Sequence, residues 1–89
     1  MSYTVQFRPR AAKQLKALPK GVRKTIAQII DALAENPRPS GAVQLKGTDF
    51  MRVRVRDYRV IYELRDDVLV VLVVLVVRIG HRRDIYRGL

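Results

Sequence analysis

Hydrophobic positions in the first half of the chain recur mainly with a helical period. After a short β-forming segment at 2–7, apolar residues repeat every three or four positions over 9–18 and again over 22–35. Pro9 suits the first turn of a helix, where its missing N–H costs nothing. The Pro- and Gly-containing segment 36–41 ends the second stretch. This half is therefore predicted to form one strand followed by a helical hairpin.

The second half has the two-residue period of β-strands. Alternating segments at 50–56 and 58–65 predict two strands, and the apolar segment 67–78 predicts a third. The segment 42–45 is compatible with a further short strand. Because the last strand is apolar on both faces, we expect it at the centre of the sheet or beneath a partner. Gly80 is expected to end it, leaving a tail that is compatible with a helical turn.

Together these elements predict a single α+β domain over residues 1–89. The expected architecture is a small, mainly antiparallel sheet of about four strands, covered on its apolar face by the two helices. A chain of 89 residues has a small core, but its 48% hydrophobic content still favours a packed domain over disorder.

Several classes of protein are disfavoured by composition. The absence of cysteine excludes disulfides and thiolate zinc sites, and it fits a cytoplasmic location. The N-terminal residues lack the pattern of a secretion signal. The longest apolar run is 68–77, shorter than the roughly 17–25 residues of a membrane helix, so no membrane association is expected.

Charge points to a polyanionic partner. The chain has 18 Lys and Arg against 8 Asp and Glu, a net charge of +10. Such an excess is typical of nucleic-acid binding, and an acidic protein partner is also compatible with it. Alternation places Arg52, Arg54 and Arg56 on one face of their strand, beside Arg59 of the next. Adjacent like charges are destabilising, which favours an anionic ligand over the alternative of a solvated face with local carboxylate partners.

The remaining chemistry is limited. With His81 as the only histidine, a two-histidine ribonuclease and a His-rich metal site are excluded, and no glycine-rich phosphate loop is present. We therefore expect neither a metal nor a small-molecule cofactor. RNA cleavage without metal needs a base, cations at the phosphorane and an acid. Arginine suits the cationic task but transfers protons poorly, so His81 or Tyr86 would have to help.

Each candidate also has a structural alternative. Arg59 could pair with Glu63, Tyr86 could cover the core from a C-terminal turn, and His81 could be an ordinary surface residue. The candidate catalytic residues are Arg59, Arg82, Tyr86 and His81, and the candidate RNA-binding residues are Lys46, Arg52, Arg54 and Arg56.

The sequence resembles the RelE/ParE toxin superfamily. The resemblance spans nearly the whole chain: the YTVQF strand, the NPRP break, the QLKG turn, RVRVRDYRVIYEL and VVRIGHRRDIYR. It implies a compact fold like that of microbial ribonucleases and a neutralising RelB-like antitoxin. It also implies ribosome-dependent cleavage of mRNA by attack of the 2′-hydroxyl, which would inhibit translation.

The resemblance also suggests roles for individual residues. Family arginines fall on Arg59 and Arg82, and a C-terminal tyrosine falls on Tyr86, although its spacing from Arg82 is shorter than in some relatives. Members compared have lysines where Arg52 and Arg54 stand. Because arginine scarcely acts as a base, this departure favours proton transfer by the tyrosine or the single histidine. Basic contacts to the scissile nucleotide fall on Lys46, Arg52 and Arg54.

Two other functions remain open. A ParE-like toxin would bind and poison DNA gyrase without cutting RNA, and such toxins generally lack the arginine–arginine–tyrosine set. A non-catalytic RNA-binding or ribosome-associated protein is permitted by the charge alone.

Overall fold

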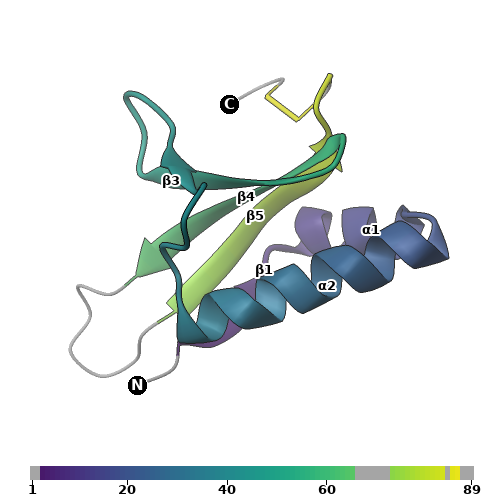
Figure 1. The fold of residues 1–89 in the computed structure, drawn as a ribbon, viewed down its shortest axis with the longest axis horizontal. Helices are drawn as coiled ribbons and strands as arrows, with labels where there is room; N and C mark the ends of the chain where they lie inside the picture. The colour runs from purple at the N-terminus through teal and green to yellow at the C-terminus, as the bar shows by residue number, and fades with distance from the viewer. Residues whose placement is uncertain (1–2, 66–72, 84, 87–89) are drawn as a thin grey trace.

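A mixed five-stranded sheet with two helices on one side forms the domain (Figure 1). The computed structural model describes residues 3–65, 73–83 and 85–86. The strand order is β1-β5-β4-β3-β2, with β1 parallel to β5 and the other pairs antiparallel. The elements are β1 (Thr4–Phe7), α1 (Pro9–Ala17), α2 (Lys20–Glu35), β2 (Val43–Gln44), β3 (Phe50–Val55), β4 (Tyr58–Arg65) and β5 (Val73–His81).

The predicted α+β class and the helical hairpin are confirmed. Pro9 opens α1, as expected, and Pro19 lies between the two helices, directly before α2. The sheet has five strands rather than about four, because the short segment after α2 does pair, as Val43 and Gln44 against β3. Across the described ranges, no helix is long and apolar enough to cross a membrane.

Strand β5 extends further than expected. Gly80 does not end it: Gly80 pairs with Arg59 and His81 pairs with Tyr58. The absence of a side chain at Gly80 serves packing instead, because a Cβ there would lie 3.3 Å from Cδ1 of Ile85. The part of the predicted last strand at 67–72 lies outside the described residues.

An irregularity interrupts the pairing of β4 with β5. Ile61 pairs with Arg78, whereas the next residue, Tyr62, pairs with Val76, so β5 carries one extra residue, Val77. Such a bulge shifts the alternation of side chains between the two faces of a strand. As a result Val76 and Ile79, three positions apart, both lie in the helix-side core, while Val77 lies in a separate cluster.

The sheet is covered on both faces. The main core packs the helices against one face, and β5 is central, as its apolar sequence predicted. The other face is not simply the open row of arginines expected from the sequence, because a second apolar cluster lies there. That cluster consists of the buried residues Ile61, Val77 and Ile85, with Leu45, Phe50 and Leu75 packed against them. Figure 1 shows the yellow segment after β5 (residues 82–83 and 85–86) on the side of the sheet away from α1 and α2.

Tyr62 connects the sheet to the segment that follows α2. Its side chain is fully buried, and its hydroxyl donates a hydrogen bond of 2.7 Å to the carbonyl oxygen of Pro37. Burial raises the pKa of Tyr62 to about 12, against a smaller opposing effect of the positive charge of Arg38.

We predict an alkaline loss of stability that depends on Tyr62. A folded-state pKa above the unfolded value of 10.0 means that the stabilising effect is complete below about pH 10 and is lost as pH rises toward about 12. Tyr62→Phe should lose about 1 kcal/mol at neutral pH but show a shallower alkaline decline. Urea unfolding of both proteins from pH 7 to pH 11.5 checks this, because lysine titration is common to both. An equal decline in the two proteins would contradict the assignment.

Candidate functional site

The hairpin between β3 and β4 brings two arginines directly opposite each other. Arg54 and Arg59 are partners across the antiparallel pair, so they share a face. Arg52 lies two residues along on the same face, opposite Ile61. Only Arg56 and Asp57 connect the strands, and Arg56 takes a positive φ of 57°, as such short hairpin turns require.

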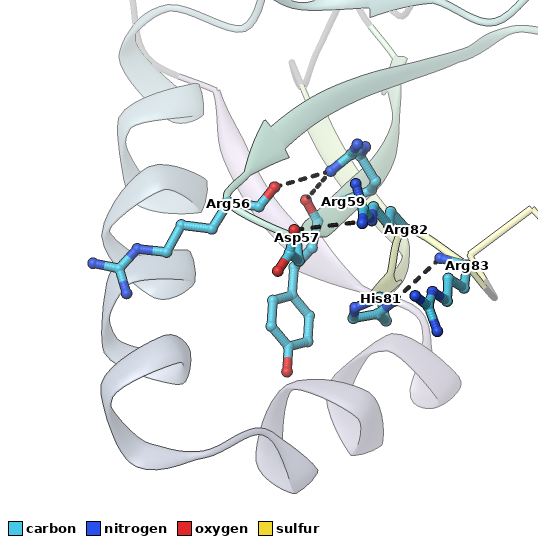
Figure 2. A network of polar contacts seen from close by, with 7 residues as sticks. Arg56, Asp57, Arg59, His81, Arg82 and Arg83 are labelled. Carbon is cyan, nitrogen blue, oxygen red and sulfur yellow. Dashed lines mark hydrogen bonds and ion pairs between the residues drawn. The ribbon is translucent and has the colours of Figure 1, made fainter.

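The guanidinium of Arg59 is held by the backbone of this turn. Its Nη1 donates to the carbonyl oxygens of Arg56 at 3.1 Å and Tyr58 at 3.0 Å (Figure 2). The alternative pairing of Arg59 with Glu63 is wrong. Glu63 lies four positions beyond Arg59 along β4. Its carboxylate is 3.6 Å from Arg8 and 3.6 Å from Arg65.

Arg82 reaches the same turn from the segment after β5. Its backbone N–H donates to the carbonyl of Asp57 at 2.7 Å, and its Nε lies 3.9 Å from the Asp57 carboxylate. Both side chains of this ion pair are exposed, so the pair contributes little stability. The short backbone bond fixes where Arg82 leaves the sheet. Figure 2 shows Arg59 and Arg82 together at the turn, and we refer to Arg54, Arg59 and Arg82 as the arginine cluster.

Two of the predicted phosphate-binding residues lie away from this cluster. Arg56 was expected on the same face as Arg52 and Arg54, but β3 ends one residue earlier and the Arg56 side chain points away from Arg59 and Arg82 (Figure 2). Its positive φ explains the change, since strand alternation no longer applies there. Lys46 is exposed in the turn before β3, at the opposite end of that strand from Arg54.

His81 does not lie with the arginine cluster. It pairs with Tyr58, one position from the pairing of Arg59 with Gly80, so its side chain occupies the opposite face. The Tyr58 ring packs against the helix-side core, and the His81 ring meets it edge-on with centroids 5.7 Å apart. Nδ1 of His81 accepts the backbone N–H of Arg83 at 3.2 Å, so this histidine shapes the turn after β5.

Tyr86 is placed by its neighbour. Ile85 is 1% exposed in the second apolar cluster, and its N–H donates to the carbonyl of His81 at 3.0 Å. Gly80, which Ile85 contacts, is the strand partner of Arg59. Tyr86 is 43% exposed, so the idea that it covers the core is wrong: Ile85 does so, and Tyr86 follows it directly along the chain.

Arg78 is a residue that sequence reasoning missed. It directly follows the apolar run 68–77 in the sequence, but it lies inside β5 and is only 9% exposed. Its Nη1 donates to the carbonyl of Ile85 at 3.0 Å. Burial, and to a smaller extent the charge of Arg10, lower the pKa of Arg78. The available signal was a lone charge between Val77 and Ile79, in a strand otherwise apolar on both faces.

The arrangement suits anion binding rather than metal chemistry. In the part of the chain that the structure describes, no group of three or more His, Cys, Asp or Glu side chains is placed to hold a metal ion. The arginine cluster instead combines three permanent positive charges with one exposed carboxylate, that of Asp57. Guanidinium groups bind phosphate oxygens through two parallel hydrogen bonds, so the chemistry of this surface suits a phosphate.

Comparison with known proteins decides the family. The sequence model of a family described as "ParE toxin of type II toxin-antitoxin system, parDE" matches residues 5–86. The chain belongs to the RelE/ParE toxin superfamily. The chain is 33% identical to a protein named toxin RelE1 of Methanocaldococcus jannaschii, over 99% of both chains. It is 30% identical to a RelE-like toxin protein of Escherichia coli, over 97% of this chain and 92% of the other.

Solved structures of RelE toxins have the same fold as this chain. The archaeal RelE–RelB complex from Pyrococcus horikoshii OT3 matches with a TM-score of 0.78 and 30% identity, covering 92% of this chain and 97% of that one. The intact E. coli RelBE toxin–antitoxin complex matches with a TM-score of 0.77 and 28% identity, covering 90% and 96%. The recognition of the family from DYRVIYEL and GHRRDIYR is confirmed, and the chain is a RelE-like toxin of the type II class.

We predict that charge repulsion between Arg54 and Arg59 lowers the free energy of unfolding. Arg54→Gln should raise the free energy of unfolding by about 0.2–1 kcal/mol at low salt, because like charges directly opposite in a sheet are destabilising. The gain should shrink at about 0.5 M salt, where exposed charges are screened. Chemical denaturation with urea at two salt concentrations measures it. Arg23→Gln, an exposed arginine on α2, controls for the loss of one positive charge; equal effects of the two substitutions would contradict a local repulsion.

Proposed function

We propose that this chain is a ribosome-dependent endoribonuclease that cleaves mRNA in the cytoplasm and so inhibits translation. The observation that carries the proposal is the meeting of Arg59, from β4, and Arg82, from the segment after β5, at one turn. Two side chains from separate stretches of sequence thus place permanent positive charge at one exposed place. This is what a scissile phosphate requires as negative charge grows on it.

The arginine cluster supports a metal-free reaction. The 2′-oxygen of the nucleotide attacks the phosphorus, the bond to the 5′-oxygen breaks, and the products are a 2′,3′-cyclic phosphate and a 5′-hydroxyl. Arg59 uses Nη1 to hold the backbone, which leaves Nη2 and Nε to donate to phosphate oxygens. Arg82 is exposed and tied through its backbone. Arg54 and Arg52 on the adjacent strand extend the charge along the RNA backbone.

Proton transfer falls to Tyr86 rather than His81. Of these two candidates, only Tyr86 follows a residue anchored beside the arginine cluster, and it is exposed. His81 lies on the opposite face with Nδ1 already accepting a hydrogen bond. Tyr86 provides a single hydroxyl on one side of the RNA, so on its own it would catalyse the proton transfers only weakly. The ribosome would therefore bend the mRNA and supply the rest of the proton transfer.

A neutralising antitoxin is part of the proposal. The solved complexes from E. coli and P. horikoshii contain RelE together with RelB. By analogy, this chain would bind a RelB-like protein with a helical segment on the basic surface. The charge of +10 favours an acidic segment. Such a segment would compete with RNA for the arginine cluster or displace the C-terminal residues.

Poisoning of DNA gyrase is the second candidate function. It is favoured by one observation, the match to a family described by the ParE toxin of parDE. ParE-like toxins act as binding agents and generally lack the arginine–arginine–tyrosine set that this chain has in Arg59, Arg82 and Tyr86. Mapping transcript ends after a short pulse of expression separates the functions. Cuts inside codons support the nuclease, trapped gyrase–DNA complexes support the alternative, and harmless expression favours a plain binding protein.

We predict that Arg82→Ala and Arg59→Ala each abolish cleavage. Loss of one group that stabilises the transition state typically costs about 10²–10³ in rate, whereas Arg82 is exposed and an exposed arginine contributes little to folding. Cleavage of ribosome-bound mRNA, read by primer extension, should fall at least about 100-fold, with unfolding curves close to wild type. Arg23→Ala on α2 is the matched control and should cut normally. Retained cleavage by Arg82→Ala would rule out the assigned site.

A further inference from the structure

The buried arginine of β5 is placed to control the segment that follows the strand. We propose that Arg78 is a positioning residue: its guanidinium latches the tail, defined as Arg83, Ile85 and Tyr86, in place after the arginine cluster. The latch itself is a statement about structure. Its effect on catalysis rests on the nuclease function proposed above.

Burial of Arg78 is costly unless the charge is bonded. Moving a charged group out of water costs several kcal/mol when it is not compensated, and Arg78 is 9% exposed at the irregularity between β4 and β5. The lowered pKa of Arg78, caused first by burial and then by Arg10, agrees with this cost. An aliphatic residue would fill the same position more cheaply. An aliphatic residue could not make the 3.0 Å bond from Nη1 to the Ile85 carbonyl.

Ile85 is the residue that anchors the end of the tail. Ile85 is buried, whereas Arg82, Arg83 and Tyr86 are exposed. Three contacts converge on it: Arg78 holds its carbonyl, the His81 carbonyl accepts its N–H at 3.0 Å, and its side chain lies against the space left by the absent side chain of Gly80. Of these, only the bond from Arg78 carries a charge, and charge-assisted bonds are about twice as strong as neutral ones.

Loss of the latch should affect turnover more than binding. Tyr86 follows Ile85 directly and loses its fixed place when Ile85 is released, whereas Arg82 keeps its 2.7 Å backbone bond to Asp57. Arg52 and Arg54 are on β3 and do not depend on the tail. The affinity for programmed ribosomes should therefore persist while Tyr86 becomes misplaced.

The test uses Arg78→Met, which keeps the length of the side chain and removes its donors, and Arg78→Lys, which restores a positive charge and a donor. Hydrogen exchange measures the latch directly. In Arg78→Met the Ile85 amide should exchange at least about tenfold faster, while the Val60 amide in the sheet changes less than about twofold. Arg78→Lys should recover part of the protection. Arg23→Met, the same substitution on the surface of α2, should change neither amide.

Cleavage of ribosome-bound mRNA by the same proteins measures the consequence. We expect kcat of Arg78→Met to fall at least about tenfold with KM within about twofold, and Arg78→Lys to recover part of kcat. Unchanged Ile85 exchange in Arg78→Met would overturn the latch. Faster Ile85 exchange with unchanged kcat would overturn the positioning role.

A second variant covers the case in which Arg78→Met loses protection throughout the sheet. Gly80→Ala leaves Arg78 in place but puts a Cβ 3.3 Å from Ile85 Cδ1, and it should also speed Ile85 exchange and lower kcat. If Gly80→Ala changes neither Ile85 exchange nor kcat, the result counts against the proposal. If the wild-type protein does not cut RNA, the nuclease function and the catalytic part of this proposal fail together, while the exchange data still decide the latch.

Discussion

The pairing of β4 with the last three residues of β5 is the interaction on which the rest of the site depends. Arg59 and Gly80 are opposite each other in that ladder, and the β3–β4 turn lies directly beyond it. When the ladder forms, the residues after β5 reach the turn, and the 2.7 Å bond from Arg82 to Asp57 closes the arrangement. The two arginines therefore meet because of backbone hydrogen bonds. Repulsion between their positive charges opposes this arrangement.

This arrangement explains why a small protein can carry a concentrated positive charge. The apolar cluster of Ile61, Val77 and Ile85 lies on the same face as the arginines and contributes burial there. Arg59 is further fixed by two carbonyl oxygens, which are partial negative charges on the protein itself. The repulsion between Arg54 and Arg59 is thus offset locally, by groups that leave most guanidinium donors available for a ligand.

Much of the fold could be predicted because the hydrophobic pattern is regular. A period of three to four residues identified both helices, and a period of two placed Arg54 and Arg59 on one face before their pairing was known. The errors arose where tertiary contacts override local preference. Gly80 was expected to end β5, but pairing with Arg59 keeps it in the strand, and this puts His81 on the opposite face from Arg59. The positive φ of Arg56 removed it from the arginine row in the same way. The role of Arg78 was not visible in the sequence, because it depends on a carbonyl seven residues later.

The order of the strands has a consequence for the timing of synthesis. β5 lies at the centre of the sheet, between β1 and β4, yet it is the last strand in the chain. Strand β1 has no partner in the sheet until β5 has been made, because its pairing is with Val73, Val74, Leu75 and Val76. Such long-range pairing folds more slowly than local structure. A nascent chain therefore cannot assemble the arginine cluster until β5 and Arg82 have been synthesised and have left the ribosome.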